Sequence, residues 1–294
     1  TGLLHSYKAD APVIVVGNVT AGGTGKTPTV IWLVHALRAE GFTPGIVSRG
    51  YGGSHSGTSK RVDVDSDAAV VGDEPVLLAR RGRCPVVVDS DRVRAAAMLI
   101  EDGVNLIIAD DGLQHRRLQR DYEICVVDGE RGLGNRRLLP AGPLREPASR
   151  LDTVDQVLVN GTNELANAMA FELRAIDACR LNGSLARPLK GFKDTTVHAV
   201  AGIGNPKRFF DLLRSYGIQV IEHEFPDHAA ISLSELEFGD TFDVFMTEKD
   251  AVKLGRHLSD KYWHVPVDLY MDTEQSKSLI EHIASQLQSR GDQS

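Results

Sequence analysis

Short apolar stretches alternate with longer amphipathic ones over the first 160 residues of the chain. Most of the apolar stretches are continuous rather than alternating, which is typical of strands buried on both faces of a parallel sheet. This pattern predicts an α/β fold in which helices cover both faces of the sheet, an α/β/α arrangement. We expect strands at 12–16, 44–47, 85–88, 104–109, 122–127 and 156–160, with helices at 29–39, 76–81 and 92–100.

A second alternation begins near residue 195 and predicts a second, smaller α/β/α domain. Extended segments at 171–176 and 186–192 flank a polar turn and favour a two-stranded linker between the domains. We therefore divide the chain into a first domain at 1–170, a linker at 171–192 and a second domain at 193–294, whose last helix can pack back on the first. Strands of the second domain are expected at 197–201, 219–222, 243–246 and 263–267, and helices at 206–216, from 232 and at 274–289.

The turn after the first strand, residues 17–28, reads Gly-Asn-Val-Thr-Ala-Gly-Gly-Thr-Gly-Lys-Thr-Pro. A strand, a glycine-rich turn, Lys-Thr and a helix form the order that binds a nucleoside triphosphate, because the backbone N–H groups of the turn and helix N-terminus point at the phosphates. Lys26 would reach the β and γ phosphates, and Thr27 would place its hydroxyl on Mg²⁺. The strict pattern has glycine where this chain has Thr20, so a glycine-rich connection in an ordinary α/β domain remains the alternative. The nucleotide-binding residues that we expect are Thr20, Ala21, Gly22, Gly23, Thr24, Gly25, Lys26 and Thr27.

Two aspartates, Asp110 and Asp111, follow the apolar strand at 104–109. Because the carboxyl ends of parallel strands meet at one edge of a sheet, these carboxylates are expected near Thr27. Carboxylates at this edge hold Mg²⁺ or its water opposite a phosphate loop, so the sequence predicts a magnesium site. The alternative is that the two aspartates only form the turn after the strand.

Phosphoryl transfer to an alcohol also requires a group that orients or deprotonates the acceptor. Asp73, Glu74 and His228 are the candidates for this base. A carboxylate hydrogen-bonded to an imidazole is a better base than an exposed one, because the pair spreads the accepted proton. Asp73 or Glu74 can instead cap the helix that follows, and His228 can be an exposed loop histidine. The sequence alone does not place Asp73 beside His228.

Composition limits the class of protein. The chain has 294 residues, of which 42% are hydrophobic and 25% are charged, as in soluble globular proteins. No apolar run approaches the ~18 residues that a membrane-spanning helix needs. The three cysteines, Cys84, Cys125 and Cys179, are widely spaced and form neither a disulfide framework nor a metal pattern, which favours a reducing compartment.

Charge is distributed unevenly along the chain. The formal net charge is −7, yet residues 116–150 hold eight arginines against five acidic residues. This basic segment indicates either an anionic ligand or surface, or a solvated loop, and charge alone does not decide between them. The net acidity and the aromatic content of 6% argue against a nucleic-acid partner.

Several segments together resemble one family, the tetraacyldisaccharide 4′-kinases, which are the lipid A 4′-kinases of Gram-negative bacteria. Most specific are Arg-Gly-Tyr-Gly, Asp-Asp-Gly-Leu-Gln-His and Pro-Ala-Gly-Pro-Leu-Arg-Glu, which other phosphate-loop kinases do not share. A small hydroxyl residue at the position of Thr20 is itself usual in this family. The matching segments run in the family's order over nearly the whole chain, at 17–28, 47–53, 72–75, 110–115, 139–147, 225–228 and 247–253.

The resemblance implies ATP-dependent phosphorylation of the 4′-hydroxyl of a tetraacyldisaccharide 1-phosphate in lipopolysaccharide biosynthesis, with Mg²⁺ as cofactor. It implies two α/β/α domains joined by a two-stranded linker, with the site in the cleft between them. It also implies that Asp73 is the base and that His228 reaches across from the second domain as its partner. Asp110 and Asp111 become the magnesium-side acids. The residues that we expect near the lipid substrate are Glu74, Arg49, His115, Arg116 and Arg145.

Members of this family usually begin with an additional hydrophobic or amphipathic segment that binds the inner membrane. This chain begins at Thr1, without an initiator Met and without such a segment. The resemblance thus implies a peripheral position at the cytoplasmic face of the bacterial inner membrane for the natural protein. The chain as it stands is expected to be soluble.

Two other functions fit part of the sequence. A GTPase or ATPase switch would share the phosphate loop, but its guanine-specificity motif, such as Asn-Lys-x-Asp, is not found. The nearest approach, at 247–250, lacks the asparagine. A soluble small-molecule kinase would use the same phosphate loop and acids on a water-soluble acceptor.

Overall fold

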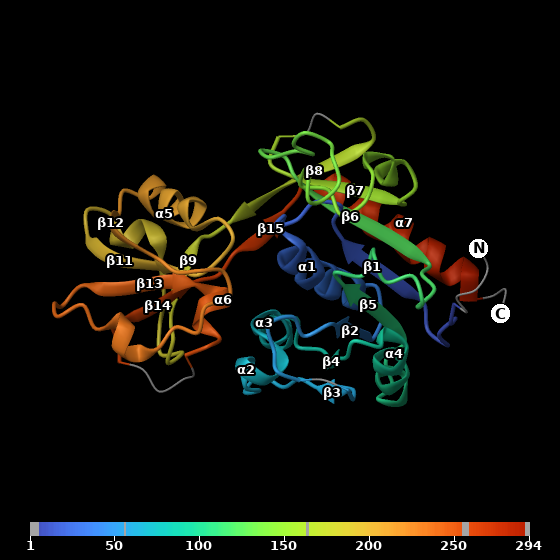
Figure 1. The fold of residues 1–294 in the computed structure, drawn as a ribbon, viewed down its shortest axis with the longest axis horizontal. Helices are drawn as coiled ribbons and strands as arrows, with labels where there is room; N and C mark the ends of the chain where they lie inside the picture. Colours follow the sequence, from blue (N-terminus) through green and yellow to red (C-terminus); the bar gives the residue numbers. More distant parts are fainter. Residues whose placement is uncertain (1–5, 56, 163–164, 255–258, 292–294) are drawn as a thin grey trace.

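The computed structural model describes residues 6–55, 57–162, 165–254 and 259–291. Its larger sheet is parallel from β8 to β4, and the antiparallel strands β15 and β3 form its two edges (Figure 1). The predicted parallel α/β fold is therefore confirmed. In sheet order the nine strands are β15 (Asp268–Tyr270), β8 (Ala168–Arg174), β7 (Gln156–Asn160), β6 (Tyr122–Asp128), β1 (Val13–Gly17), β5 (Leu106–Asp110), β2 (Pro44–Ser48), β4 (Val86–Val88) and β3 (Lys60–Arg61).

The central strands of this sheet are buried on both faces. Alternate residues of β1 enter two separate apolar clusters, with Ile14 and Val16 in one and Val13 and Val15 in the other. This arrangement explains why the strands are apolar at nearly every position rather than at every second one. The helices packed on the first cluster are α1 (Lys26–Ala39), α3 (Asp73–Gly82) and α7 (Thr273–Gly291), and α4 (Arg92–Glu101) packs on the second. Two short elements, α2 (Ala68–Val71) and η1 (Ala148–Asp152), complete this unit.

The smaller sheet forms a second unit (Figure 1). Its four strands from β14 to β12 are parallel, and the hairpin β9–β10 is added antiparallel to β14. In sheet order the strands are β10 (Ala186–Pro188), β9 (Asp177–Arg180), β14 (Tyr262–Val265), β13 (Asp243–Thr247), β11 (Thr196–Ala201) and β12 (Gln219–Glu224). The helices of this unit are α5 (Pro206–Ser215), α6 (Glu248–Ala251), η2 (Leu189–Phe192) and η3 (Leu233–Leu236).

Two strands connect the units, but they are not the predicted pair. β8 leads into the second unit and β15 leads back, and the two strands pair antiparallel, with Leu173 opposite Leu269. The prediction of both linker strands within 171–192 is wrong in its second strand, because β10 pairs with β9 inside the smaller sheet. A tight turn near Gly183 closes that hairpin locally, whereas the pairing of β8 with β15 joins segments too far apart in sequence for a local pattern to reveal.

The last helix, α7, follows β15 and lies on the larger sheet (Figure 1). Its buried residues Leu279, Ile280 and Ile283 belong to the same apolar cluster as α1. The second unit is therefore inserted into the chain of the first, between β8 and β15. Among the described helices, none is both long enough and apolar enough to span a bilayer.

Candidate active site

The phosphate loop, residues 18–25, leaves β1 at the carboxyl edge of the larger sheet and ends where α1 begins. Gly22 and Gly25 have φ angles of 96° and 103°, a left-handed backbone that glycine adopts without steric cost. Because Gly25 makes this turn, α1 starts directly at Lys26. The first turn of α1 thus offers backbone N–H groups to phosphate oxygens, whereas the N–H of Ala21 in the loop donates to the carbonyl of Pro143 (2.8 Å).

One contact within the loop and one contact with a neighbouring segment brace it. The side-chain amide of Asn18 donates to the carbonyl of Gly22 (3.3 Å) and to the hydroxyl of Thr24 (3.4 Å). On the other side, Thr20 pairs with Leu144 in an antiparallel bridge. Thr20 is buried in this bridge and has no positive φ, so the position that the strict pattern gives to glycine does not need one here.

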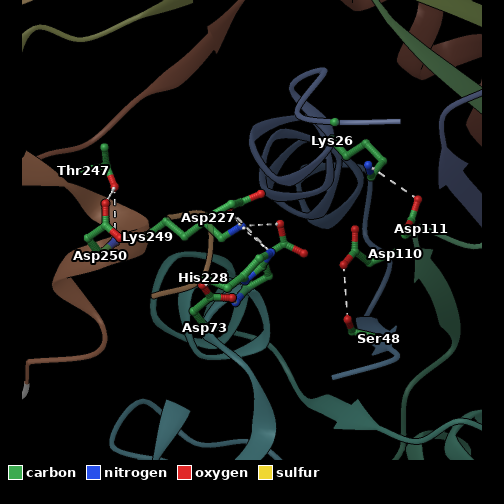
Figure 2. Close-up of polar contacts among 12 residues, drawn as sticks. Lys26, Ser48, Asp73, Asp110, Asp111, Asp227, His228, Thr247, Lys249 and Asp250 are labelled. Atoms are coloured by element: carbon green, nitrogen blue, oxygen red, sulfur yellow. Dashed lines mark hydrogen bonds and ion pairs between the residues drawn. The ribbon is translucent and has the colours of Figure 1, made fainter. Parts of the chain in front are cut away.

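Lys26 projects from the first turn of α1 toward an acidic partner. Its ammonium lies 3.5 Å from Asp111 (Figure 2). The guanidinium of Arg145 lies 3.0 and 3.1 Å from the two oxygens of the same carboxylate. Burial alone would raise the pKa of Asp111, but Lys26 and Arg145 outweigh it and lower that pKa. Asp111 is thus ionised and holds two cations at the edge of the phosphate loop.

Asp110 is the last residue of β5, and only 3% of its surface is exposed. The hydroxyl of Ser48 donates to its Oδ2 (3.2 Å), and Arg92 donates to its backbone carbonyl (3.4 Å). Burial, followed by the charges of Glu74 and Asp111, raises the pKa of Asp110 to about 7. This carboxylate would therefore gain from a nearby divalent cation.

The oxygen donors at this edge suit Mg²⁺. Thr27, Asp110 and Asp111 offer hydroxyl and carboxylate oxygens, which this hard cation prefers. Within the described ranges, no group of three or more His, Cys, Asp or Glu is arranged to hold a metal by itself. A Mg²⁺ ion here would complete its shell with phosphate oxygens and water, as is usual at nucleotide sites.

Asp73 and His228 meet across the two units (Figure 2). Asp73 is the first residue of α3 and is 4% exposed, and its Oδ1 accepts the backbone N–H of Glu74 (2.8 Å). Its Oδ2 lies 3.1 Å from Nδ1 of His228, which follows β12 in the smaller sheet. His228 has a left-handed backbone, with φ of 62°, and its N–H donates to the carbonyl of Gly202 (3.3 Å). The structure thus brings together two candidates that the residue pattern alone did not connect.

Lys249, from α6, completes this contact. Its ammonium lies 3.4 Å from Nε2 of His228 and 3.2 Å from Glu74. Burial alone would lower the pKa of Lys249, but Glu74 and Asp73 outweigh it and raise that pKa. Because an ammonium group only donates, Nε2 of His228 is the acceptor, and the proton of the neutral ring lies on Nδ1. His228 therefore donates to Asp73.

The other predicted substrate residues are placed differently. Glu74 and Arg145 belong to the site through Lys249 and Asp111, as described above. The side chain of Arg116 is 77% exposed and lies 3.5 Å from Glu146. Arg49 is exposed, and His115 is partly buried, with an Nδ1 that has no hydrogen-bond partner. Burial and the charge of Arg92 lower the pKa of His115.

Sequence reasoning did not single out Arg92, Lys249 or Lys253. Arg92 is buried beside Asp110, and the ammonium of Lys253 lies 3.8 Å from Oδ2 of Asp73. Both lysines lie within 247–253, a segment noted for the family resemblance and for an incomplete guanine-specificity motif, neither of which gave these lysines a role. Arg92 looked like an ordinary first residue of a helix, and a charged residue at that position carries no signal of its own.

A strand, a phosphate loop, a helix and acidic residues at the sheet edge define the class: an α/β protein that binds a nucleoside triphosphate. Residues 1–288 match the family described as Tetraacyldisaccharide-1-P 4′-kinase. The chain belongs to this family.

Named relatives agree with this assignment. The chain is 50% identical to a tetraacyldisaccharide 4′-kinase of Nitrosococcus oceani over 287 residues, 96% of this chain and 85% of that protein. It is 47% identical to one of Pseudomonas aeruginosa over 271 residues, 91% and 82% of the two chains. The crystal structure of LpxK from Aquifex aeolicus in complex with ATP superposes with a TM-score of 0.79 at 28% identity, covering 97% of this chain and 91% of that one. These matches support a kinase that uses ATP and do not favour a nucleotide switch.

Proposed function

We propose that this protein transfers the γ-phosphoryl group of ATP to the 4′-hydroxyl of a tetraacyldisaccharide 1-phosphate, a precursor of lipid A. The observation that carries this proposal is the 3.1 Å contact between Asp73 and His228, next to the phosphate loop. A protein that only binds or hydrolyses a nucleotide does not need an acceptor site built from two units.

The triphosphate would be held by the loop N–H groups and by Lys26. The ion pair with Asp111, at 3.5 Å, holds the ammonium of Lys26 at the edge of the phosphate loop. Its charge offsets the negative charge of the β and γ phosphates. Mg²⁺, bound through Thr27, Asp110 and Asp111, would add charge neutralisation between the phosphates.

Asp73 acts as the base in this proposal. Its Oδ2 accepts the proton of the 4′-hydroxyl as the sugar oxygen attacks the γ phosphorus, and ADP leaves. The Nδ1–H of His228 keeps the carboxylate oriented, and Lys249 holds the imidazole from its other side. Most of the rate enhancement would then come from positioning and charge stabilisation.

The four acyl chains of the acceptor make a membrane surface the natural place for this reaction. We propose a peripheral position at the cytoplasmic face of the inner membrane, where ATP is available. The exposed side chains of Leu138 and Leu139, beside the segment that braces the phosphate loop, support an apolar contact there. For the polar part of the acceptor we propose Glu74, Arg49, His115, Arg116 and Arg145.

The test is an assay with ATP, Mg²⁺ and an acylated glucosamine disaccharide 1-phosphate. We expect phosphate on the 4′-oxygen of the lipid, and little transfer to a water-soluble sugar or from GTP. Lys26→Met should abolish transfer, whereas Lys60→Met, at an exposed lysine on the edge strand β3, should retain it. Transfer to the soluble sugar at an equal rate would contradict the proposal, as would hydrolysis of ATP without any transfer.

A further inference from the structure

The second unit touches the first at another place, on the far side of the phosphate loop from Asp73. Arg208, in the first turn of α5, donates to the carboxylate of Asp128 (3.3 Å) and to the side-chain oxygen of Asn160 (3.5 Å). Asp128 and Asn160 are the last residues of β6 and β7 in the larger sheet. Both are buried, at 3% and 2% exposure, so a side chain of the second unit reaches fixed polar groups of the first.

These two acceptors are connected to the phosphate loop. The amide of Asn160 donates to the carbonyl of Thr24 (3.5 Å). Asp128 also binds Arg131 (3.3 Å), whose guanidinium donates to the carbonyl of Gly23. Arg208 is therefore separated from the loop by one residue, Asn160, along the first path and by two residues, Asp128 and Arg131, along the second.

The order of strands places this network relative to the nucleotide. β6 and β7 lie on one side of β1, whereas β5, which carries Asp110, lies on the other. The γ phosphate must face the acids and Asp73, because the acceptor attacks there. The nucleoside end of ATP must then extend over the ends of β6 and β7, where Arg208 lies.

We propose that Arg208 is a positioning residue for the nucleoside end of ATP, and that its contacts with Asp128 and Asn160 couple the second unit to nucleotide binding. A guanidinium suits this place because it makes several directed hydrogen bonds and also stacks on a flat aromatic base. Arg208 and Arg131 share one buried carboxylate, which holds a cation from each unit at the same strand ends. This inference rests on the proposed use of ATP.

The test measures nucleotide binding without acceptor, so that it is independent of which lipid is phosphorylated. We expect Arg208→Ala to weaken binding of a non-hydrolysable ATP analogue and of ADP by the same factor, about 5- to 20-fold. The two affinities should fall by the same factor because the proposed contact is with the nucleoside end, which is the same in both nucleotides. In the kinase assay, KM for ATP should rise by a similar factor while kcat changes less than twofold. The nucleotide affinity of Arg208→Lys should lie between that of Arg208→Ala and that of the unaltered protein.

Arg214→Ala is the matched control. Arg214 lies in the last turn of the same helix, its side chain is 44% exposed against 43% for Arg208, and it pairs with Asp211 and Glu222 inside the second unit. We expect no change in nucleotide affinity for this variant. The proposal is overturned if Arg208→Ala binds ADP like the unaltered protein, if it loses kcat instead of affinity, or if Arg214→Ala has the same effect.

Discussion

The two contacts between the units differ in kind. His228 has a short side chain and a left-handed backbone, and its Nδ1 lies 3.1 Å from Oδ2 of the buried Asp73. Arg208 reaches Asp128 with a long, 43% exposed side chain at 3.3 Å. A short side chain with few rotatable bonds suits a proton transfer, which tolerates little misplacement of the reacting atoms. A long, flexible side chain can keep its hydrogen bonds when its partner shifts, which suits binding. This difference is in keeping with our proposals that the Asp73–His228 contact serves the chemistry and the Arg208 contact serves nucleotide affinity.

Asp73→Asn should give the largest effect. An amide of nearly the same shape cannot accept the proton, so we expect kcat to fall about 10²- to 10⁴-fold while KM for ATP stays within twofold. Steady-state kinetics with both substrates varied would measure this. Asp227→Asn is the control, because that carboxylate also lies near His228, at 3.7 Å, but is 46% exposed. A larger loss in the control than in Asp73→Asn would assign the base elsewhere.

His228→Ala should cost less, roughly 10- to 100-fold in kcat, because the base itself remains. The pH–rate profile should also change, since the variant removes the hydrogen-bonding partner of the carboxylate that acts as the base. His228→Gln keeps a donor and should recover part of the loss. An unchanged pH–rate profile in His228→Ala would argue against the pair.

A third contact, between α3 and the smaller sheet, should affect stability rather than activity. Burial, followed by the charges of Arg81 and Arg80 on α3, lowers the pKa of His264 to about 4. The unfolded chain takes up this proton near its ordinary pKa of about 6.5, so stability is full above that pH and is lost as pH falls toward the folded-state pKa. We expect a loss of about 1–3 kcal/mol between pH 7 and 4 from this group.

Denaturant unfolding at several pH values would measure this loss. His264→Gln, which cannot titrate, should have a shallower pH dependence over that range, while kcat near neutral pH stays close to normal. Parallel pH curves for the two proteins would show that His264 is not held neutral at this interface.

The smallest expected effect is the coupling between the two functional contacts. If His228 serves chemistry and Arg208 serves affinity, their effects should be additive. The free energy that the double variant His228→Ala/Arg208→Ala loses in kcat/KM should then equal the sum of the losses of the two single variants, within about 0.5 kcal/mol. A coupling well above 1 kcal/mol would mean that both side chains act through one shared closure of the units. Chemistry and nucleotide affinity could then not be divided between the two contacts.

Features formed by residues close together in the sequence were predicted, whereas features formed by distant segments were not. The six central strands of the larger sheet, from β7 to β4, were predicted well because both of their faces are buried and the apolar run is visible along the chain. The edge strands β3 and β15 were not predicted. The phosphate loop was predicted because its strand, turn and helix are contiguous. The helix expected at 76–81 begins earlier, at Asp73, because the acidic residues that were expected to precede it form its first turn.

The features that were not predicted depend on segments far apart in the chain. The pairing of β8 with β15 and the place of Arg208 beside Asp128 leave no periodic trace in either segment. Asp73 and His228 were connected only through the family resemblance. Their roles stay predictions that the variants above can test. The domain limits at 170 and 193 also stay predictions.

The paired linker has a consequence for how the site reassembles after each turnover. Because β8 and β15 tether the second unit at both of its ends, His228 searches a small volume around Asp73 instead of diffusing freely. Short tethers of this kind give effective concentrations in the millimolar range or above. Contacts that would be too weak to hold two separate proteins together then suffice, and they can open for product release without the loss of their partner.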